Sequence, residues 1–247
     1  MTIARARLLF FLGTLAANVH AAEVHVAVSA NFAPPLHALG EAFSRQTGHK
    51  LLASPGSTGK LYAQIRNGAP FDAFLSADEA APRRLEDDGL AVSGSRFTYA
   101  LGRLVLWSSR NGLVDPRGEV LKSNRFRKLA LANPKLAPYG NAAREVMEKL
   151  GVWAALQGRV VQGENIAQTF QFIATGNADL GFVALSQVDA ARTGSRWIVP
   201  SALHAPIRQD ALLLGRARSN PAARAFLEYL RSPEAKHRIR DFGYDLP

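Results

Sequence analysis

The first part of the chain alternates short apolar strands with helices, and this alternation constrains the fold more than any other feature. Valine-rich or aromatic runs predict strands at 23–29, 49–53 and 71–76. Helical spacing of apolar residues, followed each time by a glycine, predicts helices at 32–47, 60–67 and 79–88. Because such alternation builds a parallel sheet covered by helices on both faces, we predict an α/β fold.

A second series of the same kind occupies the middle of the chain. Strands are predicted at 97–108, 127–132, 159–162, 178–185 and 196–200, and helices at 140–150 and 166–175. The chain ends with a strand at 207–214 and helices at 221–230 and 233–242. This late strand and its two helices are expected to return to the first series.

Two series imply two lobes. We place residues 22–100 together with 201–247 in the first lobe and residues 101–200 in the second. Ligands of open α/β lobes bind beyond the carboxyl ends of the strands, so the cleft between the lobes is the expected site. The chain crossings at 98–103 and 200–205 are the hinge candidates.

The first 21 residues have the pattern of a secretory signal peptide. Arg5 and Arg7 precede an apolar run at 8–17, and Val-His-Ala at 19–21 is a plausible cleavage point before Ala22. The apolar run is about half of the ~20 residues that span a bilayer. We therefore expect a protein exported to the periplasm.

Composition excludes several kinds of function. The chain has no cysteine, so it can form neither thiolate metal sites nor cysteine nucleophiles. Its formal charge is +10, or +8 without Arg5 and Arg7. This excess could attract anions or an acidic surface, or it could be an ordinary solvated arginine bias. The basic residues are scattered without interleaved aromatics, so we expect no nucleic-acid partner.

Four strand-to-helix junctions carry neutral hydrogen-bond donors. They are the segments 29–31, 56–59, 137–140 and 164–166. Free N–H groups and the helix dipole make a helix start attractive to anions, although Ser, Thr and Asn also serve simply as helix caps. Four such segments in one exported two-lobed chain favour a bound oxyanion. The donors of the four segments include no carboxylate that could accept a proton from the anion. This favours a fully deprotonated tetrahedral anion over protonated phosphate.

The same segments, in the same order, resemble periplasmic molybdate-binding proteins, the substrate-binding subunits of molybdate ABC transporters. The resemblance rests on SANF, PGSTGKLYAQIRNGAPFDAFLSADE, GSRFTYALGRLVLWS, NPKLAPYG and ADLGFVAL, and it covers essentially the whole mature chain. It implies the two-lobed type II periplasmic-binding-protein fold and a non-enzymatic role. It also implies molybdate or tungstate as ligand, no other cofactor or metal, a membrane permease as partner, and a monomer.

The resemblance also implies which residues bind the oxyanion. They are Ala30, Asn31, Ser57, Thr58, Tyr139 and Ile166. Tyr139 and Ile166 would contribute backbone N–H groups. Some members of the family use a tyrosine after the ADLG strand, where this chain has Ala184. That donor is therefore either missing from this chain or replaced, and the side chain of Asn31 is the candidate replacement.

Two alternatives remain at this stage. The ligand could be sulfate or another small anion on the same fold. A periplasmic hydrolase would instead use Asp72 or Asp78 in the cleft, although Asp78 and Glu79 open a helix, where acids act as caps. Lys60 follows the glycine loop and is expected to face solvent. The histidines show no metal-ligand spacing.

Overall fold

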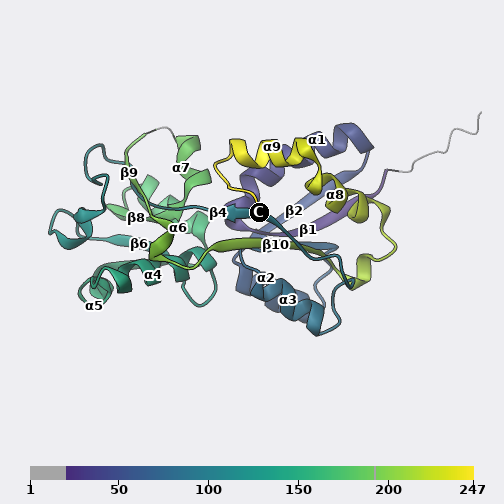
Figure 1. The fold of residues 1–247 in the computed structure, drawn as a ribbon, viewed down its shortest axis with the longest axis horizontal. Coiled ribbons are helices and arrows are strands. Elements are labelled where there is room, and N and C mark those ends of the chain that lie inside the picture. The colour runs from purple at the N-terminus through teal and green to yellow at the C-terminus, as the bar shows by residue number, and fades with distance from the viewer. Residues whose placement is uncertain (1–20, 192) are drawn as a thin grey trace, which may run out of the picture.

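The computed structural model describes residues 21–191 and 193–247. The predicted signal peptide lies outside these residues except for Ala21. The described chain forms two lobes side by side, each built on one five-stranded sheet (Figure 1). Within the described ranges, no helix is long and apolar enough to cross a membrane.

The sheet of the first lobe has the strand order β2-β1-β3-β10-β4. Its strands are β1 (Glu23–Ser29), β2 (Lys50–Gly56), β3 (Ala73–Leu75), β4 (Phe97–Gly102) and β10 (Ile207–Leu213). The first three are parallel, as predicted. The sheet as a whole is mixed, because β10 returns antiparallel between β3 and β4. The predicted return of the chain to the first lobe is thus confirmed.

Helices cover both faces of this sheet. They are α1 (Ala33–Thr47), α2 (Thr58–Arg66), α3 (Ala80–Asp87), α8 (Pro221–Arg231) and α9 (Pro233–Asp241), with short 3-10 turns at Ala30–Phe32 and Gly215–Ala217. Val26 of β1 belongs to the core shared with α1, α8 and α9. Its neighbour Ala27 faces the other way, into the core shared with α2 and α3. The alternation of side chains along β1 therefore supplies both cores.

The second lobe repeats this plan with the strand order β7-β6-β8-β5-β9. Its strands are β5 (Leu104–Ser108), β6 (Leu129–Ala132), β7 (Val160–Gly163), β8 (Leu180–Ala184) and β9 (Ser195–Ile198). Its helices are α4 (Pro138–Lys149), α5 (Trp153–Leu156), α6 (Ile166–Ala174) and α7 (Leu185–Ala191), with 3-10 turns at Glu119–Lys122, Gln157–Arg159 and Ser201–Leu203. Neither α5 nor α7 is predicted from the sequence.

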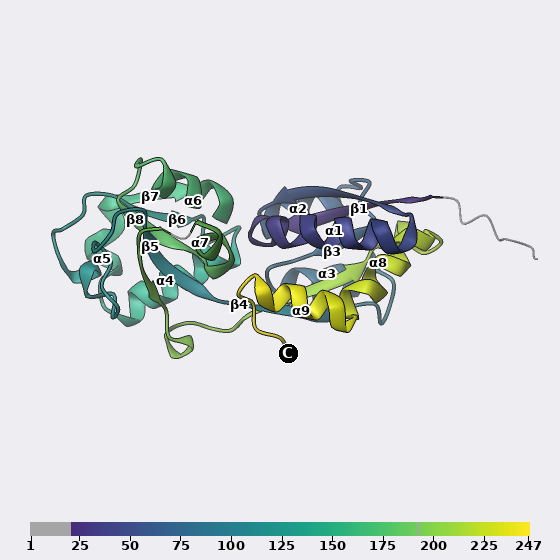
Figure 2. The same cartoon turned by 90° about the horizontal axis from the view of Figure 1, so that it is seen from above.

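Both connections between the lobes lie close to the predicted positions. The run predicted as one strand at 97–108 is two strands in different sheets, separated by Arg103. The second connection joins β9 to β10 (Figure 2). β4 continues to Gly102, two residues past the lobe limit placed at residue 100. The lobe limits and the hinges remain proposals.

The tightest helix–strand contact in the second lobe gives a test of the fold. A Cβ at Gly140 in α4 would lie 2.1 Å from the carbonyl oxygen of Ala132 in β6. Because a backbone atom cannot move cheaply, we expect Gly140→Ala to lower the free energy of unfolding by about 1–3 kcal/mol. Urea unfolding followed by circular dichroism measures this. Gly158→Ala is the matched control, since its Cβ would meet nothing within 4 Å; equal stability of the two variants would contradict the packing described.

Candidate functional site

The four donor-bearing segments converge on one small cavity between the lobes. Each follows the carboxyl end of a strand, namely β1 and β2 in the first lobe and β6 and β7 in the second. The cavity has about 200 Å³ of space free of protein atoms, part of it open to solvent, and is lined by Ser29, Ala30, Asn31, Gly56, Ser57, Thr58, Ala77, Ala137, Pro138, Tyr139, Asn165 and Ile166. All six residues predicted to bind the ligand therefore lie together. That they bind an anion remains a prediction.

If these residues were only helix caps, each side chain would accept a hydrogen bond from the first turn of its helix. Only one of the four does so. The side chain of Asn165 accepts a hydrogen bond from the N–H of Gln168 and caps α6. Ser57 precedes α2 in extended conformation but makes no such bond. Ala137 and Ser29, which precede α4 and the turn at Ala30–Phe32, make none either. The donors at these three positions are consequently not explained by capping.

Ser57 carries the clearest sign of a missing partner. The residue is 3% exposed, and within the described chain its hydroxyl has no hydrogen-bond partner. A buried hydroxyl without a partner costs about 1–3 kcal/mol. An anion in the cavity would accept its proton and remove this cost.

Ser29 and Thr58 supply a second hydroxyl proton. Their hydroxyl oxygens lie 2.6 Å apart, and both accept from the N–H of Ala77, at 3.0 and 3.2 Å. The pair has two protons, and their mutual bond uses one of them. The other proton has no acceptor within this triangle, so one hydroxyl beside the cavity is available as a donor.

The remaining donors are backbone N–H groups. Thr58, Tyr139 and Ile166 occupy the first turns of α2, α4 and α6, where N–H groups have no partner within the helix. Gly59 is different, because its N–H donates to the carbonyl of Leu136 across the cleft at 2.9 Å. Backbone donors from both lobes thus border one enclosed space, in which their dipoles favour a negative charge.

No charged side chain lines the cavity. Lys60 forms an ion pair with Glu164, which joins the two lobes outside the cavity. Both side chains are about half exposed. Lys60 therefore points away from the cavity, as expected. Within the described ranges, no group of three or more His, Asp or Glu side chains could bind a metal cation.

The expected replacement of the missing tyrosine by the Asn31 side chain is wrong. The Nδ2 of Asn31 donates to Gln209 Oε1 at 2.9 Å and to the hydroxyl of Tyr244 at 3.0 Å, which uses both of its protons. Ala184 is fully buried and does not line the cavity. Asn31 is left with its backbone N–H as the donor available to a ligand.

The carboxylates of the hydrolase alternative have structural partners. Asp72 precedes β3, at the opposite end of that strand from the cavity, and accepts from His25 N–H at 2.8 Å while pairing with Arg216 at 3.3 Å. Asp78 accepts from the N–H of Ala81 at 2.8 Å, as the predicted cap of α3. Burial raises the pKa of the Asp78 carboxyl, although this bond opposes the effect. Asp78 lines an adjoining groove and not the cavity itself.

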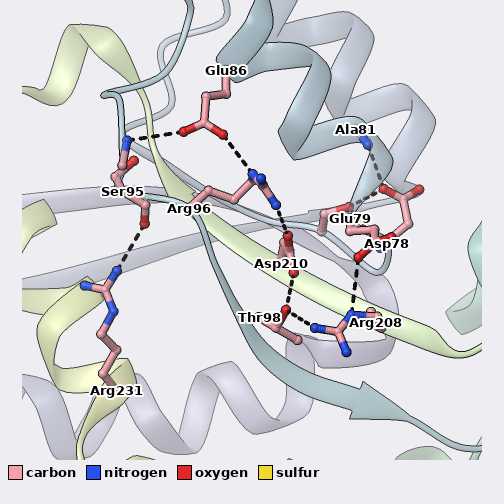
Figure 3. A network of polar contacts seen from close by, with 12 residues as sticks. Asp78, Glu79, Ala81, Glu86, Ser95, Arg96, Thr98, Arg208, Asp210 and Arg231 are labelled. Atoms are coloured by element: carbon pink, nitrogen blue, oxygen red, sulfur yellow. Dashed lines mark hydrogen bonds and ion pairs between the residues drawn. The ribbon is translucent and has the colours of Figure 1, made fainter. Parts of the chain in front are cut away.

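Beside this groove, a polar network fixes the strands that lead to the second lobe. Arg96 pairs with buried Asp210 of β10 at 2.8 Å and with Glu86 of α3 at 2.9 Å (Figure 3). Asp210 also accepts from Thr98 of β4 at 2.7 Å, and Arg208 joins Glu79 (Figure 3). β4, β10 and α3 are thereby held as one unit up to the crossings.

Comparisons with known proteins now bear on this geometry. A sequence profile of bacterial extracellular solute-binding proteins matches residues 24–245. The chain belongs to this family. The molybdate-binding protein ModA of Azotobacter vinelandii is 52% identical over 251 residues, which cover 100% of both chains. ModA of Rhodobacter capsulatus is 49% identical over 230 residues, covering 93% of this chain and 91% of that protein.

Solved structures agree with the sequence relatives. The Azotobacter vinelandii periplasmic molybdate-binding protein superposes with a TM-score of 0.88 at 43% identity, over 91% of this chain and 99% of that one. The two-lobed solute-binding fold predicted from the motifs is confirmed, and so is the resemblance to molybdate-binding proteins.

The sequence analysis missed the polar residues behind the cavity. Tyr99, Gln209 and Tyr244 are buried and hydrogen-bonded to one another or to Asn31. The one signal in the sequence is the polar pair at 209–210, which follows Arg208 and precedes the apolar end of β10. Buried polar pairs in a central strand require partners, so that pair predicts a network without saying what it contacts.

The buried phenol of Tyr244 gives a pH-dependent test. Burial raises its pKa to about 12 from the ordinary value of 10.0. Because the folded pKa is the higher one, the neutral phenol stabilises the fold below pH 10.0 and loses this contribution as the pH rises to about 12. A shift of this size corresponds to about 3 kcal/mol. We expect the stability difference between wild type and Tyr244→Phe, measured by urea unfolding, to shrink over that range; a constant difference would contradict the assigned burial.

Proposed function

We propose that this protein captures molybdate, and also tungstate, outside the cytoplasm and delivers it to the permease of an ABC importer. Two relatives covering more than nine-tenths of the chain are molybdate-binding proteins. The observation that carries the proposal is the buried Ser57 hydroxyl, which has no partner within the described residues and borders a cavity of neutral donors. A ligand that only accepts hydrogen bonds fits this set.

The donor set matches a small dianion in number and kind. Each hydrogen bond to a charged group contributes about 1.5–3 kcal/mol, so about six of them suffice for tight binding after the cost of association. A protonated anion would place its own O–H among donors, and no carboxylate lines the cavity to accept that proton. Molybdate and tungstate are fully deprotonated at neutral pH, and their longer metal–oxygen bonds would separate them from sulfate by size.

The arrangement of donors also supports a closing motion. Thr58 belongs to the first lobe, whereas Tyr139 and Ile166 belong to the second. A complete donor set exists only when the lobes are together, so the anion binds the closed form better and shifts the population toward it. The crossings at 98–103 and 200–205 are the proposed hinges. The permease would then distinguish loaded from empty protein by its shape.

The remaining parts of the proposal follow from this role. Delivery to an importer places the mature protein in the periplasm, in agreement with the signal peptide predicted at 1–21. The protein would act as a monomer, because one chain contributes every lining residue of the cavity. It would perform no chemistry on the anion, since the donors only bind it.

Isothermal titration of the mature chain with molybdate, tungstate, sulfate and phosphate tests the proposed ligand. We expect tight one-to-one binding of the first two and no heat from the others, because the cavity selects by charge state and size. Binding of sulfate alone would retain an anion site but reject molybdate. No binding of any of the four would overturn the proposed function.

Ser57→Ala tests the site itself. Losing one hydrogen bond to a charged group should weaken molybdate binding by about 10- to 100-fold. The ligand-free protein should be at least as stable as wild type, since the hydroxyl is buried without a partner in the described chain and its removal ends that cost. Ser109→Ala, an exposed serine after β5, is the matched control and should bind like wild type. Wild-type affinity in Ser57→Ala would reject this residue as a ligand.

A further inference from the structure

The carboxyl-terminal residues of the chain contact both lobes directly behind the cavity. The hydroxyl of Tyr244, which is 3% exposed, donates to the carbonyl oxygen of Asn31 at 2.8 Å. The same hydroxyl lies 3.0 Å from the hydroxyl of Ser186 in α7. Because Tyr244 gives its one proton to Asn31, the one proton of Ser186 goes either to the Tyr244 hydroxyl or to the Asn31 carbonyl oxygen, which lies 3.3 Å away. Asn31 belongs to the first lobe and Ser186 to the second, so this cluster joins them.

The chain reaches this position through a fixed path. After α9 ends at Asp241, Gly243 turns the backbone with a φ of 80°. Asp245 then pairs with Leu101 at the end of β4 through two backbone hydrogen bonds of 2.7 and 3.1 Å. The carboxyl terminus consequently lies near the junction of the lobes (Figure 1). The ring of Tyr244 also packs edge-on against Phe32, with centroids 5.3 Å apart.

These contacts fix the residue that carries one of the predicted ligand donors. The carbonyl of Asn31 is held by Tyr244 and Ser186, and its side chain by Tyr244 and Gln209. Neither Tyr244 nor Ser186 lines the cavity, so neither would touch the anion. Gln209 extends the cluster to the second lobe, where its Nε2 donates to the Tyr139 hydroxyl at 3.3 Å.

We propose that Tyr244 and Ser186 form a closure latch, a pair of positioning residues that holds the lobes together behind the ligand and orients the Asn31 N–H. This inference rests on the proposed anion-binding function. The partners come from different lobes, so their bonds exist only in the closed form and lower its free energy relative to the open form. Apparent affinity is the intrinsic affinity multiplied by the closed fraction, and the latch raises that fraction.

Single substitutions on each side of the junction test the latch. Ser186→Ala and Tyr244→Phe each keep the packing and remove the hydroxyl. We expect each to weaken molybdate binding by about three- to tenfold, through faster dissociation measured by stopped flow, with little change in the association rate. The double variant should lose less affinity than the two single losses added together, because the contact between the two hydroxyls can be lost only once.

Tyr229→Phe is the matched control. Tyr229 is a buried tyrosine of the first lobe whose hydroxyl has no partner within the described residues, so its loss should leave affinity and dissociation rate unchanged. Wild-type dissociation in Ser186→Ala would overturn the latch. So would a fully additive double variant, because additivity means that the two hydroxyls act separately.

Failure of the latch and failure of the proposed function give different results. Wild-type protein that binds sulfate instead of molybdate rejects the ligand proposal, and the variants are then compared on sulfate. If wild type binds none of the four anions, small-angle X-ray scattering of the ligand-free proteins decides. A larger radius of gyration in Ser186→Ala and Tyr244→Phe than in wild type and Tyr229→Phe supports the latch, and identical profiles overturn it.

Discussion

Hydrogen-bond donors that lack protein acceptors are the constraint on which the rest of this structure depends. Parallel strands of two sheets end at the same cleft, and each is followed by a helix whose first N–H groups have no partner within it. Ser57 adds a buried hydroxyl that likewise has no hydrogen-bond partner within the described residues. Enclosing such donors costs free energy unless an acceptor is enclosed with them. Lobe closure and anion binding are therefore one thermodynamic event.

Other contacts between the lobes act in the opposite direction and favour closure without a ligand. Gly59 donates to Leu136 across the cleft, Lys60 pairs with Glu164, and the closure latch joins Tyr244 to Ser186. The exposed ion pair contributes little, because water screens it. The other two contacts are less exposed and matter more. The difference between their stabilisation and the cost of the unpaired donors sets how much closed protein exists before the anion arrives.

Local patterns predicted the local structure well, and distant contacts account for what they missed. β1 and α1 end where valine spacing and Gly48 indicate, because those signals act over a few residues. The break at Arg103 lies within the crossing predicted at 98–103 and follows Gly102, but only tertiary pairing assigns the two parts of the run to different sheets. The partner of Asn31 could not be predicted either, because Tyr244 is 213 positions away. The four segments were predictable because each lies where a strand is followed by a helix, and the family resemblance implied the six residues within them. The hydrogen bonds of the Asn31 side chain depend on that distant tyrosine.

Because the cavity is neutral, long-range attraction of anions and discrimination among them depend on different residues. A buried arginine would bind every dianion strongly, because Coulomb attraction in a low dielectric depends little on shape. Fixed N–H and O–H groups act only over hydrogen-bond distance and within narrow angles, so they reward an anion of the right size that carries no proton. The excess of positive charge in this chain, +10 in total, lies elsewhere and acts over longer range on any anion. In the proposed function, surface charge attracts anions and the cavity discriminates among them. Different residues carry these two properties, so either could change without the other.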